Sequence, residues 1–88
     1  MTRYDTFGPD DFEPDSPKWE QIAELLEKQI RSGAWGPKYL ISEVQLMGKF
    51  GVSRPTVRKA MQHLRDQGLI YTRRNLGSFV ANGDVPSE

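Results

Sequence analysis

Cysteine is absent from the 88-residue sequence, which excludes disulfide bonds, thiol catalysis and cysteine-based zinc sites. Long apolar runs are absent as well. None approaches the ~20 residues that span a bilayer, and the first residues lack the apolar stretch of a secretion signal. We therefore expect no membrane association and a cytoplasmic location. A chain of this length forms one small domain, whose core must be stable without cross-links.

Features typical of enzymes and metal sites are also scarce. His63 is the only histidine, and no second histidine or acidic cluster lies close to it in the sequence to complete a metal site. There is no glycine-rich phosphate-binding loop of the GxxxxGK type. The acidic pair Asp10 and Asp11 lies in a segment without a regular pattern, where no rigid scaffold would hold it for acid–base catalysis. We therefore expect no enzyme activity, no metal and no cofactor.

The formal net charge is zero, yet the two signs are separated along the chain. Residues 1–27 hold eight acidic and two basic side chains, a balance of minus six, whereas residues 28–82 hold ten basic and two acidic ones, a balance of plus eight. A basic domain that follows an acidic leader favours a polyanionic partner, which the neutral total hides.

The composition divides the chain into three segments. Residues 1–15 contain two prolines and five acidic residues, and their aromatic side chains follow no helical or strand period, so we expect an irregular acidic arm. Residues 16–82 carry regular patterns and form the predicted domain. Residues 83–88 are predicted to be a polar tail.

The first helix is predicted at residues 17–32. Ser16 and Pro17 supply a cap and a first-turn proline, and apolar residues recur with helical spacing from Trp19 to Ile30. Gly33 ends the helix. We expect Trp19, like Trp35, to pack in the core or at a helix end.

Two further helices are predicted close together. Ser42 and Gln45 have the spacing of a capping box, so the second helix begins at Glu43 and ends at Gly51. Ser53 caps the third helix, whose apolar stripe precedes a terminating glycine. The stripe is Val57, Ala60, Met61 and Leu64, and the glycine is Gly68.

Short strands complete the predicted fold. Residues 38–41 read as a small strand before the second helix, and residues 69–73 and 78–81 as a hairpin with its tip at 74–77, where Asn75 and Gly77 accept positive φ. Three helices plus a C-terminal β-hairpin wing make an α+β, winged helix-turn-helix fold, with the small strand between the first and second helices.

The third helix presents a basic face opposite its apolar stripe. Arg54 and Arg58 are four residues apart and emerge on one side. An inserted helix end offers such arginines to guanine O6 and N7, while Ser53, Thr56 and the free amides bind phosphates. Arg73 and Arg74 of the hairpin, by the same logic, reach a phosphate or a minor groove.

The sequence resembles the DNA-binding domain of GntR-type bacterial transcription regulators. The strongest stretch is FGVSRPTVRKA at 50–60, followed by GLI at 68–70 and the wing segment GSFV at 77–80, and the likeness runs over residues 18–81 without a gap. Because it covers turns, caps and basic positions together, it implies a winged-helix regulator that binds double-stranded DNA.

The resemblance implies a set of DNA-binding residues. Ser42 and Glu43 occupy the family's Pro-Ser-Glu position, the third helix supplies most of the rest, and the wing tip enters the groove beside it. The expected set is Ser42, Glu43, Ser53, Arg54, Thr56, Arg58, Lys59, Arg73, Arg74, Asn75 and Gly77. The sequence departs from the family at four places. Ile41 replaces the proline before Ser42, and Gly36-Pro37 replaces a Pro-Gly turn. Val44 occupies a position that is often a basic or polar phosphate contact in relatives, and Leu76 removes a cation from the wing tip.

GntR-type regulators also carry a C-terminal domain that binds a metabolite and dimerises the protein. The chain ends about seven residues after the wing, so we expect no small-molecule effector site within it. Whether it is a fragment or a stand-alone protein, and whether it forms a homodimer, stays open.

The resulting hypothesis is sequence-specific binding of double-stranded DNA as a repressor. An alternative hypothesis is a winged-helix module that binds another protein through the acidic arm and the first helix. In a minor variant, the arm folds back over the basic face and blocks it.

Overall fold

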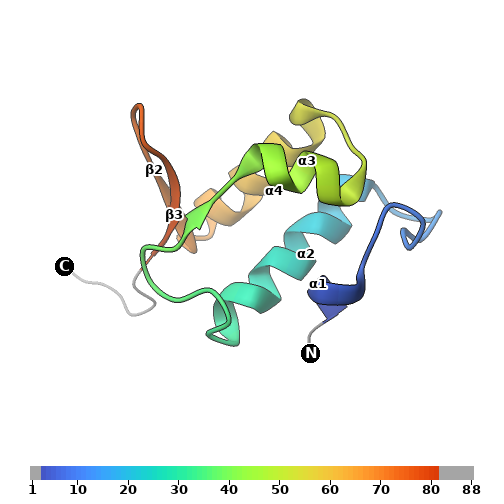
Figure 1. The fold of residues 1–88 in the computed structure, drawn as a ribbon, viewed down its shortest axis with the longest axis horizontal. Helices are drawn as coiled ribbons and strands as arrows, with labels where there is room; N and C mark the ends of the chain where they lie inside the picture. The colour runs from blue at the N-terminus through green and yellow to red at the C-terminus, as the bar shows by residue number, and fades with distance from the viewer. Residues whose placement is uncertain (1–2, 82–88) are drawn as a thin grey trace.

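The computed structural model describes residues 3–81, and Figure 1 shows their arrangement. The elements in chain order are α1 (Arg3–Thr6), α2 (Lys18–Arg31), β1 (Leu40–Ile41), α3 (Glu43–Phe50), α4 (Arg54–Asp66), β2 (Ile70–Arg73) and β3 (Gly77–Val80). The winged helix-turn-helix predicted from the sequence is confirmed. The predicted polar tail, 83–88, lies outside the described residues, and no helix among residues 3–81 has the length and apolar character needed to cross a membrane.

The three strands form one antiparallel sheet with β3 in the centre, in the order β1-β3-β2. Leu40 on one side and Tyr71 on the other both pair with Phe79. The β2–β3 hairpin extends beyond the helices as the wing, at the left of Figure 1. β1 is shorter than predicted, but Lys38 N still donates to Val80 O at 2.7 Å, so the chain runs beside β3 before the strand begins.

The core lies where α2 and α3 pack against α4. The predicted stripe of α4 is confirmed: Val57, Ala60, Met61 and Leu64 are all 0% exposed. Because a helix has 3.6 residues per turn, burial of this stripe turns the basic side of α4 outward.

The turn between α3 and α4 is short and tightly closed. Ser42 caps α3, and its Oγ accepts from Gln45 N at 3.1 Å, as predicted. Gly51 adopts φ 64°, a left-handed conformation that costs glycine little. Ser53 stands at the N-cap position of α4, but its side chain makes no capping bond to the backbone and instead lies 3.3 Å from the Thr56 hydroxyl.

The N-terminal arm, which we predicted to be irregular, contains regular structure and buried residues. Residues Arg3–Thr6 form the short helix α1, and Phe7 is buried at 4% exposure. Phe7 contacts Phe12 and Phe50 edge-on, with ring centroids 5.0 and 5.9 Å apart. Three aromatic residues without a regular period give no helix or strand signal, yet together they bury enough apolar area to hold the arm against α3.

Tyr4 joins the same aromatic cluster. Its ring lies 5.2 Å from Trp35, and Lys49 Nζ is 4.5 Å from its centroid. Burial, with smaller contributions from Tyr39 and Asp5, raises the pKa of Tyr4 to about 12. The hydroxyl is therefore neutral at physiological pH.

Replacement of Phe7 tests whether the arm contributes to folding. We expect Phe7→Ala to lower the free energy of unfolding by about 3 kcal/mol, because it removes a buried ring and leaves a cavity against Phe50. Urea denaturation measures the change. Leu76→Ala, at a side chain that is 66% exposed, is the control and should change the free energy of unfolding by less than about 0.5 kcal/mol. Similar small changes in both variants would contradict a docked arm.

Candidate nucleic-acid interface

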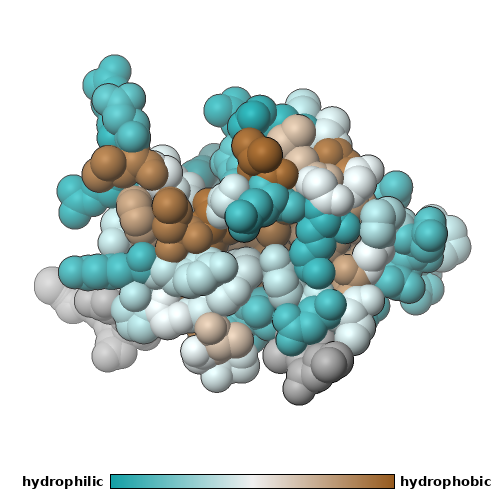
Figure 2. Space-filling model, in the orientation of Figure 1, coloured by the Kyte–Doolittle hydropathy of each residue, from teal (hydrophilic) through white to brown (hydrophobic). Residues whose placement is uncertain are grey.

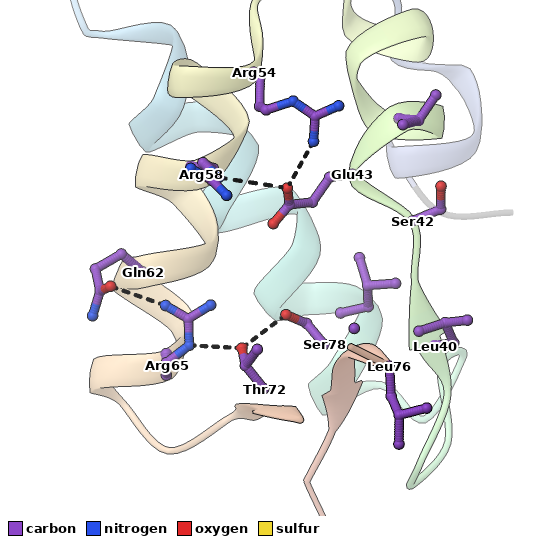
Figure 3. A pocket seen from close by; sticks show the side chains of 13 residues that line it. Leu40, Ser42, Glu43, Arg54, Arg58, Gln62, Arg65, Thr72, Leu76 and Ser78 are labelled. Atoms are coloured by element: carbon purple, nitrogen blue, oxygen red, sulfur yellow. Dashed lines mark hydrogen bonds and ion pairs between the residues drawn. The ribbon is translucent and has the colours of Figure 1, made fainter. Parts of the chain in front are cut away.

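An open groove of about 710 Å³ runs between the start of α3, the outer side of α4 and the wing (Figure 3). Most of its walls are formed by exposed or partly exposed side chains, three arginines among them, whereas Ile41 and Ser78 are buried. The lining residues are Leu40, Ile41, Ser42, Glu43, Val44, Arg54, Arg58, Gln62, Arg65, Thr72, Leu76, Gly77 and Ser78.

Glu43 lies between the two arginines predicted to reach DNA. Its Oε1 is 3.4 Å from Arg54 Nη1 and 3.9 Å from Arg58 Nε (Figure 3). The arginine side chains are nevertheless 48% and 70% exposed. Exposed ion pairs of this kind contribute about 0–1 kcal/mol. The carboxylate therefore orients the guanidinium groups at the groove without removing them from solvent.

The remaining predicted residues of α3 and α4 lie in three places. Ser42 lines the groove, while Ser53 and Thr56 stand at the first turn of α4. Lys59 does not line the groove. Its Nζ lies 5.1 Å from the centroid of the Trp19 ring, on the side of α4 that faces α2. One residue along a helix is a rotation of about 100°, which separates Lys59 from Arg58.

The wing carries the other predicted residues. Arg74 and Asn75 are exposed at its tip, and Asn75 adopts φ 66°. Arg73 lies with Cζ 5.8 Å from the Tyr71 ring centroid. Gly77 has φ 120°, and a Cβ built on it would come within 2.9 Å of Leu40 Cδ1. The backbone conformation therefore favours glycine at this position, whereas the Leu40 contact is with the end of a flexible, exposed side chain that can shift.

A hydrogen-bond network that the sequence analysis did not include connects α4 to the wing. Arg65 Nε donates to Thr72 Oγ1 at 3.0 Å, and its Nη1 donates to Gln62 Oε1 at 2.9 Å. The Thr72 and Ser78 hydroxyls are 2.9 Å apart, across the two strands (Figure 3). Gln62 and Arg65 follow Arg58 by four and seven residues, and this spacing predicts them on the same outward face of the helix, although not their contacts with the wing.

His63 takes part in packing in this structure. Its Nε2 lies 2.8 Å from Gln67 Nε2, and its ring contacts Trp19 at 5.7 Å between centroids. No group of three or more metal-ligating side chains occurs among residues 3–81.

Comparison with known proteins identifies the family that has this arrangement. The family model of bacterial regulatory proteins, gntR family, matches residues 18–80, which span α2 to the end of β3. The chain belongs to the GntR family. The resemblance drawn from the FGVSRPTVRKA stretch and the wing segment is thereby confirmed.

Two relatives of this GntR-family chain are named as repressors. The histidine utilization repressor of Klebsiella aerogenes is 37% identical over 67 residues, which are 75% of this chain and 28% of the relative. The HTH-type transcriptional repressor NagR of Bacillus subtilis is 41% identical over 66 residues, or 74% of this chain and 27% of NagR. The chain thus matches just over a quarter of the length of each relative.

A solved structure shares the GntR fold over most of both chains. AraR(DBD) in complex with operator ORX1 has a TM-score of 0.73 and 41% sequence identity, and the match covers 85% of this chain and 92% of that one.

The network between α4 and the wing predicts a specific loss of stability. Thr72→Val removes the acceptor of Arg65 and the partner of the buried Ser78 hydroxyl. We expect the free energy of unfolding to fall by about 1 to 2 kcal/mol, with faster amide hydrogen exchange in β2 and β3. Arg74→Ala, at the exposed tip, should change neither quantity appreciably. Unchanged exchange in Thr72→Val would show that the network does not hold the wing.

Proposed function

We propose that this chain binds double-stranded operator DNA in a sequence-specific manner and acts in transcription repression. One observation carries the proposal: Arg54 and Arg58 stand exposed on the groove wall of a helix whose opposite side is completely buried. A helix anchored in this way can present two guanidinium groups to base edges with little loss of side-chain freedom.

The proposed docking places the first half of α4 in the major groove. The groove of B-DNA is about 12 Å wide and accepts one helix. Arg54 and Arg58 then face guanine O6 and N7, while the hydroxyls of Ser42, Ser53 and Thr56 bind phosphates. The wing tip lies over the neighbouring minor groove.

Glu43 is compatible with a polyanionic ligand because of its partners. An unpaired carboxylate in the groove would repel phosphates. With Arg54 and Arg58 on either side, the local sum of the three charges is positive. We infer that Glu43 keeps the two guanidinium groups in place while their outward-facing N–H groups bind the bases.

Binding as a homodimer, which the sequence leaves open, extends the proposal. A single winged helix covers one half-site, and two copies one helical turn apart bind far more tightly. Selection of duplexes from a random pool tests this. A two-fold repeat in the selected sequences supports binding as a dimer, whereas a single short motif supports binding as a monomer.

The alternative function, a protein-binding module, was suggested by the aromatic residues of the arm. Tyr4, Phe7 and Phe12 pack against Phe50 or one another and do not form an outward aromatic surface. The arm also contacts α2 and the Gly51 turn, and none of its described residues, 3–15, lines the groove. The packing therefore favours neither the alternative nor a blocking role for the arm.

Removal of either groove arginine tests the DNA-binding proposal. We expect Arg54→Ala or Arg58→Ala to weaken binding to a selected duplex by about 1 to 3 kcal/mol, and to random DNA by less. Fluorescence anisotropy measures both. Arg31→Ala is the matched control, since Arg31 is an exposed arginine paired with Glu27 at the end of α2. Equal losses on both duplexes would limit the groove arginines to phosphate contacts, and no loss would contradict the proposal.

Salt dependence gives a second test of the same interface. If Arg54, Arg58, Arg73 and Arg74 each replace one condensed counterion, the logarithm of the binding constant should fall against the logarithm of salt concentration with a slope of roughly −4. Titrations at several salt concentrations measure the slope. A slope near zero would show that the basic groove and wing do not contact the phosphate backbone.

A further inference from the structure

One exposed apolar side chain in the groove is explained neither by folding nor by phosphate binding. Val44 lies in the first turn of α3, is 63% exposed and lines the groove. The first turn of a helix favours acidic and polar residues because of its dipole and free amides, and valine has a low helix propensity. Neither helix propensity nor the helix dipole therefore explains a valine at this position.

Val44 lines the same groove as Arg54 and Arg58, and it directly follows the glutamate that pairs with both. Glu43 lies within ion-pair distance of both Arg54 and Arg58, and neighbouring Cα atoms are about 3.8 Å apart. Base pairs stack about 3.4 Å apart. A base pair that neighbours those facing the arginines would consequently lie within reach of the Val44 methyl groups.

The other exposed apolar side chains of the groove lie at its wing end. Leu40 approaches Gly77, and Leu76 occupies the wing turn (Figure 3). Figure 2 shows apolar surface both at the wing and over α3 on the visible face. Leu40, in β1, and Leu76, in the wing turn, therefore lie together at one end of the groove, and Val44 forms a separate apolar contact point beside the arginines.

We propose that Val44 is a specificity-determining residue that contacts the 5-methyl group of a thymine in the major groove. The inference rests on the proposed DNA binding. Thymine is the only standard base with a methyl group at the major-groove edge, and apolar side chains recognise it there. Three arginines and one glutamate line the same groove, a balance that favours a polyanion over an apolar protein segment.

Replacement of thymine by uracil isolates this contact, because uracil pairs in the same way and lacks only the methyl group. The probes are duplexes selected from a random pool by the full chain, with each thymine replaced singly. We expect one position in each half-site at which uracil weakens binding about fourfold, the value of one buried methyl-sized group. For Val44→Ala, uracil at that position should have no further effect.

Leu76→Ala is the matched control, since Leu76 is as exposed as Val44 and lies in the same groove. For Leu76→Ala, uracil at the sensitive position should still weaken binding as it does for the unchanged chain. Thermal unfolding should show that both variants are folded. If Val44→Ala keeps the penalty, or if no thymine shows one while the chain binds with the expected salt slope, the assignment to Val44 is wrong and DNA binding stands. If the chain binds no duplex at low salt, the proposed function itself fails.

Discussion

Burial of the apolar stripe of α4 is the constraint on which the rest of the structure depends. Val57, Ala60, Met61 and Leu64 are completely removed from solvent by packing with the other helices. Since the stripe occupies one side of the helix, the opposite side must face outward, and Arg58 with its neighbours lies there. The position of α4 thus decides which charges are available to a ligand.

The charges of the groove are organised by weak contacts. Glu43 is shared by Arg54 and Arg58, and Arg65 is held by Gln62 and Thr72. The contacts of Glu43 with the two arginines are exposed and contribute little to folding, so they can be exchanged for contacts with a ligand at small cost. Together they hold planar donors in fixed directions, which suits the base-edge recognition proposed for this GntR-family chain.

The acidic arm accounts for the neutral net charge without opposing a basic interface. Its aromatic residues pack with Trp35 and Phe50, and Pro9 lies against Gly51 in the turn between α3 and α4. The acidic residues of the arm are thereby held away from the groove. The summed charge of a small protein says little about its partner when the two signs lie on different faces.

Local patterns in the sequence determined the helices, the cap at Ser42, the glycine turns and the outward side of α4, because each depends on residues within one or two turns of one another. Only the tertiary structure decided that Lys59 lies over Trp19, that Glu43 joins the two arginines and that Thr72 links Arg65 to Ser78. The same holds for the docking of the arm. These contacts join different helices and strands, between which packing rather than periodicity sets the distance between side chains.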